Sequence, residues 1–241
     1  MSVIEVKGLS KTIGDHQVLC SACLTIDKGE LCAIIGANGA GKTSLLKCIT
    51  GLMFPDEGII LYDDTSFVDN KERVLSQIGV VMQYPNSISS MNVEELFVEH
   101  YQYLKIEKPD SINLFLNKVN LNVSLKQKIG GMSVGMKQRL LIALALSHKP
   151  QILLLDEPFN GLDPDGIMLI KEILQEFTDI GGTVLISSHS LSELEQFADS
   201  VVLIKNGKTT SKMNLKDVEL NYKDGLRGYY KELMEGNKYH D

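Results

Sequence analysis

The chain has 241 residues, of which 44% are hydrophobic, and 24 Lys and Arg stand against 31 Asp and Glu for a formal net charge of −7. This length suits one large domain or one domain with an inserted subdomain, and the acidic balance argues against nucleic-acid partners, which normally meet a basic face. No apolar run approaches the ~20 residues that cross a bilayer, and the first residues lack the regions of a signal peptide. We therefore expect a cytosolic protein, with any membrane-spanning part on another chain.

Residues 1–30 alternate apolar and polar side chains between glycines, which predicts short antiparallel strands. This segment contains Cys20 and Cys23, a C-x-x-C pair of the kind found in metal and redox sites. In extended chain, however, residues three apart point to opposite faces, and no second Cys or His pair completes a site. We therefore predict that these two cysteines are buried as small hydrophobic side chains.

The next apolar segment, residues 31–35, predicts a buried strand that leads into a phosphate-binding loop of the form G-x-x-x-x-G-K-T. Its glycines let backbone N–H groups wrap phosphates, Lys42 can reach the β and γ oxygens, and the Thr43 hydroxyl can hold Mg²⁺. A helix over 42–50, ended by Gly51, would point its positive end at the same anions. The predicted nucleotide contacts are Gly36, Ala37, Asn38, Gly39, Ala40, Gly41, Lys42, Thr43 and Ser44. The loop predicts binding of ATP or GTP; a chance glycine-rich turn would lack the flanking strand and helix.

A helical region follows the short strand over 80–82 and Gln83. Asn92 with Glu95 forms a capping box, and apolar residues follow at three- and four-residue spacing. We predict a single domain over 1–241 in which residues 84–150, approximately, form an inserted α-helical subdomain.

Ser133 follows two glycines and precedes a long run that ends near His148, which predicts a helix capped by Ser133. The free N–H groups and the positive dipole end of such a helix can bind a phosphate. Most capped helices bind nothing, so this pattern alone leaves both interpretations open.

Two carboxylates end the buried strand predicted over 151–155. Adjacent side chains on a strand point to opposite sides, so Asp156 and Glu157 should have different tasks. Asp156 would hold Mg²⁺ through its water shell, and Glu157 would polarise an attacking water, which is typically worth ~10²–10⁴-fold in rate. The alternative is a charged strand end without a function.

The rest of the chain alternates strands and helices, which predicts an α/β fold with a mostly parallel sheet. Asp163 and Pro164 start one helix, and Ser190 with Glu193 caps another after a strand over 183–187. The strand over 201–204 with its Asn-Gly turn predicts a hairpin. The tail over 209–241 contains no motif that indicates a role.

The peptide from Met132 to Arg139 is the most specific feature of the sequence, because it lies between the phosphate loop and the acidic strand end. With those two motifs, it makes the chain resemble, over about residues 3–208, the ATP-binding subunit of an ABC transporter. The family pattern is L-S-G-G-Q followed by Gln-Arg. The matching residues are Ser133, Gly135, Gln138 and Arg139, and the departures are Met132, Val134 and Met136.

The resemblance implies a P-loop cassette with a mostly parallel sheet core, an N-terminal antiparallel β-subdomain and the inserted helical subdomain. Two copies, or one copy and a sister subunit, would enclose two Mg-ATP head to tail. Ser133 and Gly135 of one subunit would contact the γ-phosphate held by the other. Val134 places a β-branched side chain where close backbone approach is expected, so we expect a looser sandwich.

The resemblance also assigns roles to single residues. Gln83 would meet Mg²⁺ and water, Asp163 would cross the dimer interface, and His189 would contact the γ-phosphate and order the water. Ile13 stands where many members have an aromatic residue that stacks on adenine. Because stacking of a base on an aromatic ring is worth ~1–3 kcal/mol in nucleic-acid-binding proteins, we expect weaker nucleotide binding here.

As a family member the protein would be an ATPase that powers a separate, multi-spanning permease from the cytoplasmic side of the cell membrane. The G-M-K-Q-R and N-G-L-D-P peptides resemble those of peptide, antibiotic and drug exporters, including bacitracin- and lantibiotic-resistance systems. The partner would choose the cargo. The alternative is a soluble single-cassette ATPase of the iron–sulfur assembly type. A phosphoryl-transfer kinase would leave Ser133 and His189 without roles.

Overall fold

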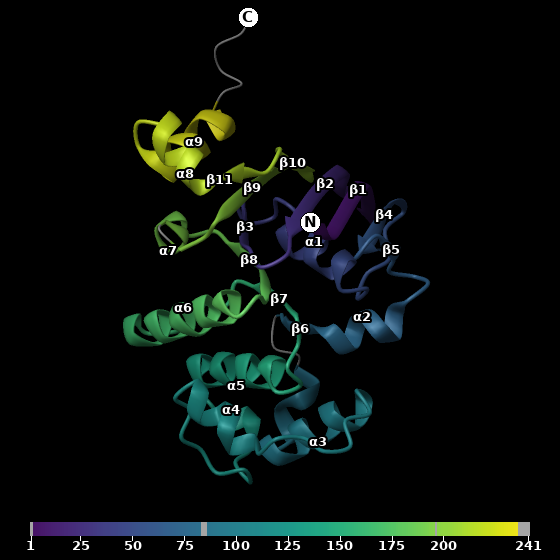
Figure 1. Cartoon of the computed structure of the whole chain (residues 1–241), viewed down its shortest axis with the longest axis vertical. Coiled ribbons are helices and arrows are strands. Elements are labelled where there is room, and N and C mark those ends of the chain that lie inside the picture. Colours follow the sequence, from purple (N-terminus) through teal and green to yellow (C-terminus); the bar gives the residue numbers. More distant parts are fainter. Residues whose placement is uncertain (1, 83–85, 196, 236–241) are drawn as a thin grey trace, which may run out of the picture.

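The computed structural model describes residues 2–82, 86–195 and 197–235, so the predicted site residue Gln83 lies outside the described residues. The chain forms two sheets, and helices lie on both sides of the larger sheet (Figure 1). The α/β class predicted from the sequence is confirmed. Within the described ranges, no helix is long and apolar enough to cross a membrane.

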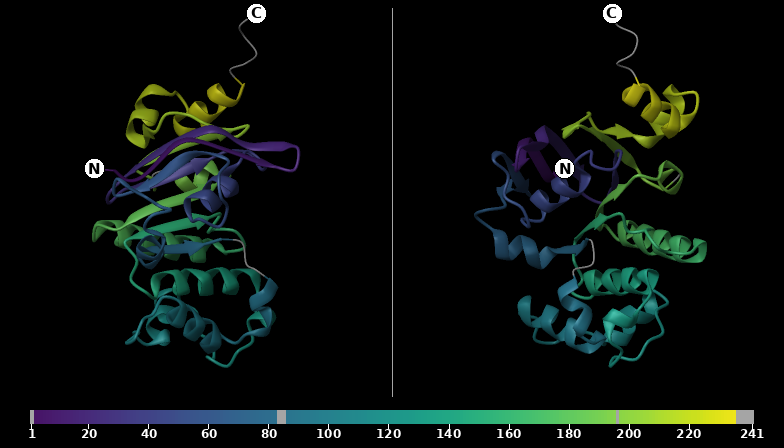
Figure 2. Two further views of the ribbon diagram at one scale, coloured as in Figure 1. Left: turned by 90° about the vertical axis from the view of Figure 1, so that its right-hand side faces the viewer. Right: turned by 180° about the vertical axis from the view of Figure 1, so that it is seen from behind.

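The smaller sheet is antiparallel and has the order β2-β1-β4-β5. Its strands are β1 (Ser2–Ile13), β2 (His16–Asp27), β4 (Glu57–Tyr62) and β5 (Thr65–Ser66). The antiparallel pairing was predicted, but the first two strands have 12 residues each and are not short. Gly8 does not end a strand; with φ +61 it lies at a register shift inside β1, so a bulge replaces the expected turn. The β1–β2 hairpin extends beyond the rest of the molecule (Figure 2).

The larger sheet has the order β10-β9-β3-β8-β7-β6, and β11 pairs with β9. Its strands are β3 (Leu31–Ile35), β6 (Ile78–Val81), β7 (Ile152–Asp156), β8 (Thr183–Ser188), β9 (Ser200–Lys205), β10 (Lys208–Thr209) and β11 (Met213–Asn214). Only β10 and β11 run antiparallel to their neighbour. The predictions of a mostly parallel sheet and of a hairpin at Asn206–Gly207 are therefore confirmed.

The helices fall in three groups along the chain. Those before residue 92 are α1 (Lys42–Ile49), α2 (Lys71–Gln77) and the 3-10 helix η1 (Asn86–Ser90). The middle group is α3 (Val93–Tyr103), α4 (Ile112–Lys118), η2 (Ile129–Gly131) and α5 (Val134–Leu146). The last group is α6 (Pro164–Asp179), α7 (Leu191–Leu194), α8 (Leu215–Asn221) and α9 (Gly225–Glu235). Helices α3, α4 and α5 lie together at the bottom of Figure 1; the limits of a helical subdomain at 84 and 150 stay a prediction.

Helix caps test the sequence patterns directly. Asn92 and Glu95 form both bonds of the predicted capping box, and the side chain of Asp163 accepts from the N–H of Gly166 at the start of α6. The predicted side-chain cap at Ser190 is wrong. Helix α7 has only four residues, Ser190 makes no side-chain cap bond, and Glu193 instead accepts from the Ser188 hydroxyl at 3.3 Å.

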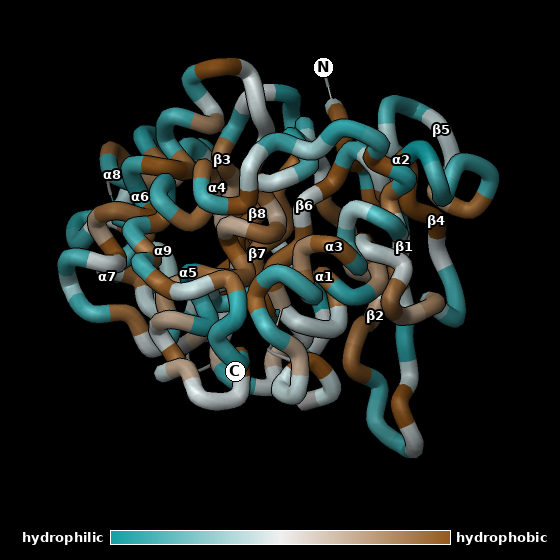
Figure 3. The backbone as a smooth tube through the Cα atoms, turned by 90° about the horizontal axis from the view of Figure 1, so that it is seen from below, coloured by the Kyte–Doolittle hydropathy of each residue, from teal (hydrophilic) through white to brown (hydrophobic). Residues whose placement is uncertain are grey.

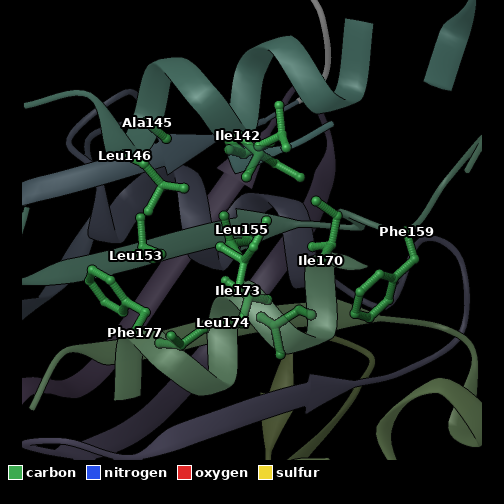
Figure 4. Packing of buried hydrophobic residues seen from close by; sticks show 14 of the residues in the cluster. Ile142, Ala145, Leu146, Leu153, Leu155, Phe159, Ile170, Ile173, Leu174 and Phe177 are labelled. Atoms are coloured by element: carbon green, nitrogen blue, oxygen red, sulfur yellow. The ribbon is translucent and has the colours of Figure 1, made fainter. Parts of the chain in front are cut away.

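Two apolar clusters cover the two faces of the larger sheet because its strand residues alternate between them. In β3, Leu31, Ala33 and Ile35 face one cluster, whereas Cys32 and Ile34 face the other. The first cluster holds β7 between α5 and α6 (Figure 4), and the second lies under α1 and the antiparallel sheet. Figure 3 shows the apolar strands β7 and β8 in the interior and hydrophilic segments at the rim.

The C-terminal helices belong to the same packed interior. Leu215 and Val218 of α8 and Leu226 and Tyr229 of α9 are buried in the cluster that also contains α5 and α6. The amino group of Lys205 donates to the Met234 carbonyl at 2.8 Å, near the end of α9. The polar tail therefore completes the cover over β9, although its sequence contains no motif.

The cysteine prediction is wrong for the C-x-x-C pair. Cys23 is exposed and Cys20 is half-buried, whereas Cys32 and Cys48 are buried; all four are free thiols. The physical reason is Ser21, whose left-handed backbone (φ +52) interrupts the extended chain that the prediction assumed.

Candidate functional site

Three segments that the sequence separates meet at one edge of the larger sheet. Strands β3, β8 and β7 are parallel neighbours, so their carboxyl ends lie together. The phosphate loop follows β3, Asp156 ends β7, and His189 follows β8. Ligands of open α/β sheets bind at this edge.

The phosphate loop needs glycine at two positions for identifiable reasons. A Cβ on Gly36 would lie 2.5 Å from the Ile204 carbonyl oxygen, so the loop packs directly against β9. Gly41 has φ +113, a conformation open to glycine, and it precedes α1 without any side-chain cap bond. The first N–H groups of α1 are thus left without a side-chain acceptor, which suits a phosphate.

Lys42 is held inside this loop with its side chain only 6% exposed. Its amino group donates to the carbonyls of Gly36 at 2.7 Å and Ala37 at 3.3 Å, and it lies 3.3 Å from Glu157 Oε1. A buried ammonium needs such partners, because leaving it unpaired is strongly unfavourable. The geometry keeps one positive charge at the centre of the predicted phosphate site.

Asp156 contacts the phosphate loop at Thr43, the residue after Lys42. One carboxylate oxygen accepts from the Thr43 hydroxyl at 2.8 Å, and the other accepts from the Ser187 hydroxyl at 2.5 Å. Sequence reasoning did not assign a role to Ser187; its only signal was a hydroxyl at the end of a buried strand. Two hydroxyl donors fix the orientation of the Asp156 carboxylate.

Glu157 contacts a different set of partners, as expected for adjacent residues at a strand end. Its Oε2 lies 2.8 Å from His189 Nδ1 and accepts from the His189 backbone N–H at 3.3 Å. Its own N–H donates to the Ser187 carbonyl at 3.1 Å, and its backbone has φ +50. A left-handed non-glycine residue is strained, and such strain is concentrated at functional sites.

A second group of predicted residues lies at the start of α5. The Ser133 hydroxyl accepts from the Met136 N–H at 3.2 Å, which confirms it as the cap. Beside it, Asp163 accepts from Arg139 at 3.1 Å, and Arg139 also donates to the Asn120 carbonyl at 3.3 Å. These residues line an open hollow of about 440 Å³. The sequence match at Arg139 carried no role; the structure shows that it ties α5 to the start of α6.

Close packing at the start of α5 explains how Val134 is accommodated. A Cβ on Gly135 would lie 2.7 Å from the Gly161 carbonyl oxygen, and a Cβ on Gly161 would lie 2.5 Å from Val134 Cγ1. Val134 therefore packs over a residue without a side chain, while 67% of its surface stays exposed. We call Ser133, Gly135, Arg139 and Asp163 the Ser133 group, and Lys42, Thr43, Asp156, Glu157 and His189 the Lys42 group. The segment from Glu157 to Asp163 connects the two groups along the chain.

Ile13 lies apart from both groups on the protruding hairpin. It is the last residue of β1, paired with His16, and its side chain is 47% exposed. Asp56 holds the adjacent chain by accepting from the Lys11 amino group and the Thr12 N–H, both at 2.7 Å. A base-stacking role for Ile13 stays a prediction.

The glycine loop surrounds the buried Lys42, and the Thr43–Asp156 and Glu157–His189 contacts lie at the ends of neighbouring strands. This arrangement is that of a P-loop nucleoside triphosphatase. A family model described as ABC transporter matches residues 19–160. Among similar proteins, the uncharacterized ABC transporter ATP-binding protein YcbN of Bacillus subtilis is 37% identical over 98% of this chain and 76% of its own length. The lantibiotic transport ATP-binding protein SrtF of Streptococcus pyogenes is 36% identical over 86% of this chain and 88% of its own length. The bacitracin transport ATP-binding protein BcrA of Bacillus licheniformis is 35% identical over 86% of this chain and 68% of its own length.

Solved structures give the same answer. The ATP-binding subunit of an ABC transporter superposes with a TM-score of 0.85 at 29% identity, covering 98% of this chain and 100% of the other. The cassette MJ0796, in a dimeric post-hydrolysis state with ADP and phosphate, gives 0.78 at 26% identity, covering 88% and 98%. The chain belongs to the ABC transporter family as one of its ATP-binding, ATP-hydrolysing subunits.

Proposed function

We propose that the Lys42 group is a Mg-ATP hydrolysis site and that the individual residues act as their contacts suggest. The backbone N–H groups over 36–44 would hold the phosphates, and Lys42 would neutralise their charge. The observation that carries this proposal is the shared carboxylate of Glu157, which contacts Lys42 at 3.3 Å and His189 at 2.8 Å. One acidic group thus lies between the phosphate-binding cation and a histidine.

The donor set suits Mg²⁺, which prefers oxygen ligands. The Thr43 hydroxyl and the Asp156 carboxylate are 2.8 Å apart, and together they would hold the ion, Asp156 through its water shell. Bound Mg²⁺ would neutralise the phosphate oxygens. The Ser187 hydroxyl keeps Asp156 turned toward Thr43. Gln83 remains a proposed partner of this ion from outside the described residues.

Glu157 would accept the proton of the attacking water. Its backbone is held by Ser187 and its carboxylate by His189, so the acceptor oxygen is positioned before the substrate arrives, as efficient general base catalysis requires. His189, which contacts Glu157 through both its ring and its backbone N–H, would keep that oxygen aimed at the γ-phosphate and order the water. Lys42, currently paired with the carboxylate, would turn to the phosphate when ATP binds.

The Ser133 group would act on the nucleotide of a second subunit. Its hollow is open and carries one capped helix N-terminus and the Asp163 carboxylate, which suits a site completed by another molecule. A dimeric arrangement is recorded for the related cassette MJ0796. We infer a head-to-tail dimer, with a second copy or a sister subunit, in which Ser133 and Gly135 meet the γ-phosphate and Asp163 crosses the interface.

The subunit would power a multi-spanning permease, carried on a separate chain, from the cytoplasmic side of the membrane. Relatives at 35–36% identity are named for transport of bacitracin and of lantibiotics, which supports export of a peptide or antibiotic. The segment around Gln83, between β6 and α3, would pass the closing motion to the permease.

The test is a pull-down of tagged Glu157→Gln protein, with ATP, from detergent-solubilised membranes. This change keeps the shape of the side chain but removes the base, so the closed state should persist and retain the permease. Glu172→Gln, an exposed change on α6, is the matched control and should recover less. Recovery of only soluble proteins, with the bait absent from membranes, would favour the cytosolic assembly ATPase instead.

A further inference from the structure

Cys20 and Cys23 lie on the same outer face of β2. Their neighbours Leu19 and Ala22 are both 0% exposed and face the interior, so each cysteine, one position further along, points outward. The alternation survives because Ser21 is an extra residue: Lys11 pairs with Leu19 and Leu9 with Ala22, so three steps on β2 oppose two on β1. This is the geometry of a β-bulge.

The strand register gives the approximate spacing of the cysteines, because each of them follows one of the paired residues Leu19 and Ala22. The bulge compresses three residues of β2 into the length of two residues on β1, which is about 7 Å at ~3.4 Å per residue. On the opposite edge, the Cys20 N–H donates to the Gly207 carbonyl at 2.9 Å and the Cys23 N–H to the Thr209 hydroxyl at 2.8 Å. Both acceptors belong to the segment 207–209, so the same neighbouring segment holds the backbone at both cysteines.

The backbone under both thiols is fixed from two sides. Besides the bonds to Gly207 and Thr209, the Ser21 N–H donates to the Ser10 hydroxyl at 3.1 Å. The Cys23 sulfur accepts from the Gly8 N–H at 3.3 Å and donates to the Ser21 carbonyl at 3.6 Å. Two thiols held at a set spacing need little ordering when they bind one ligand.

The spacing and the surroundings select the chemistry. A Cα separation of about 7 Å is at the upper limit of the range of disulfides, where a direct S–S bond is strained. A metal ion about 2.3 Å from each sulfur can bridge sulfurs up to about 4.6 Å apart, which side-chain rotation can reach. Among the residues that the structure describes, no three His, Cys, Asp or Glu side chains cluster, so tetrahedral zinc would lack protein ligands. Soft thiolates in a two-coordinate site favour Cu(I).

We propose that Cys20 and Cys23 form a two-thiolate site for one thiophilic monovalent cation of the Cu(I) class. Each thiol loses its proton to solvent and each sulfur forms one bond to the ion, with no change of oxidation state. The Gly207 N–H donates to the Ala40 carbonyl at 3.0 Å. One residue therefore links the Cys20 backbone to the phosphate loop, and a bound ion would stiffen that connection.

The test is an anaerobic titration of the full chain with Cu(I) against a chromophoric Cu(I) chelator. We expect one equivalent to bind, and Cys20→Ser and Cys23→Ser each to weaken binding at least 100-fold because chelation by two sulfurs is lost. Cys48→Ala is the matched control, since burial raises the pKa of the Cys48 thiol to about 11. Unchanged affinity in either serine variant, or loss of binding in the control, would overturn the proposal.

A second measurement does not depend on affinity. After Cu(I) addition, mass mapping with N-ethylmaleimide should show protection of Cys20 and Cys23 together, with one ion per chain. Quantitative formation of a Cys20–Cys23 disulfide with oxidised glutathione would show that the sulfurs meet directly, and would overturn the spacing on which the two-coordinate site rests.

Discussion

The Lys42 group and the Ser133 group differ in how far one chain completes them. In the first, Lys42, Asp156, Glu157 and His189 already bind one another at 2.8–3.3 Å or bind neighbouring hydroxyls. In the second, Ser133 caps its own helix and faces an open hollow. The first group is built to hold a charged ligand and do chemistry; the second presents donors to something outside the chain. In the proposed function, a single chain therefore supplies one group of residues that holds its own nucleotide and one group that acts on the nucleotide of a partner.

The sharpest test of the first half is Glu157→Gln. We expect ATP turnover to fall by ~10²–10⁴-fold, the usual contribution of a positioned base, while ATP binding is retained because Lys42 and the glycine loop are unchanged. Turnover and equilibrium binding of a labelled ATP analogue measure the two effects. Glu172→Gln should leave both unchanged. A variant that kept most of its turnover would remove Glu157 from the mechanism.

Ser133→Arg tests the second half. The bulky cation would fill the hollow, so we expect ATPase turnover to drop at least ~100-fold, with little change in ATP binding, because the nucleotide is held by the other group. The control is Ser76→Arg on α2, whose exposed hydroxyl donates only to the Arg73 carbonyl. Normal turnover in Ser133→Arg would mean that each chain hydrolyses ATP alone, and the comparison between the two groups would fail.

A pH-sensitive contact joins α3 to strand β6 of the larger sheet, outside both groups. His100 of α3 lies 3.0 Å from His148, which lies 3.0 Å from the Ile78 carbonyl of β6. If Nε2–H of His148 donates to Ile78, its Nδ1 is free to accept from His100. Burial, with a contribution from His148, lowers the pKa of His100 to about 4, and burial lowers the pKa of His148. Both rings are therefore neutral at pH 7.

The sign follows from proton counting. Between about pH 6.5 and 4 the unfolded chain binds more protons than the folded one, so stability should fall as the pH drops through this window. We expect the free energy of unfolding to be about 1–2 kcal/mol lower at pH 5 than at pH 7.5, a range that already allows for the partial exposure of the rings. Urea unfolding at pH 7.5 and 5.0 measures it. His100→Leu should show a smaller pH difference than the wild type, and His16→Leu, on the exposed hairpin, should not.

The smallest expected effect is on nucleotide affinity. Ile13→Tyr should lower the ATP dissociation constant about 5-fold, corresponding to about 1 kcal/mol at the low end of base stacking. His16→Tyr, at the paired position of the same hairpin, is the control. An unchanged ATP dissociation constant in Ile13→Tyr would exclude base stacking at this position. An equal decrease in both variants would show that the effect is not specific to position 13.

Local rules predicted much of this molecule. The caps at Asn92 and Asp163 followed from short-range patterns, because their bonds join residues three positions apart. The parallel sheet followed from the alternation of strands and helices along the chain, and the carboxylates at the end of β7 followed from the apolar run before them. The two helices of the tail, α8 and α9, could not be predicted from local patterns. They are held by the burial of Leu226 and Tyr229 against elements distant in the sequence. The role of Ser187 and the tie between Arg139 and Asp163 likewise depend on contacts across the fold.

The cysteine pair shows the limit most clearly. The prediction of opposite faces assumed that residues 20–23 are fully extended. The peptide Cys-Ser-Ala-Cys contains no signal that Ser21 adopts a left-handed backbone conformation. The Ser21 N–H donates to the Ser10 hydroxyl on β1, and the nearby Cys23 N–H donates to the Thr209 hydroxyl on β10, so the partners of this segment lie on other strands. A bulge is a property of two paired strands, so one strand alone does not reveal it.

The single apolar cluster that joins α3, α4 and α5 to the underside of the sheet and to α8 and α9 has a consequence for unfolding. Because these elements share one buried cluster, α3, α4, α5, α8 and α9 are not expected to keep a separate interior after the sheet opens. Heating or denaturant should therefore unfold these helices in one cooperative transition. Amide protons in α5 and α9 would then exchange through the same global opening.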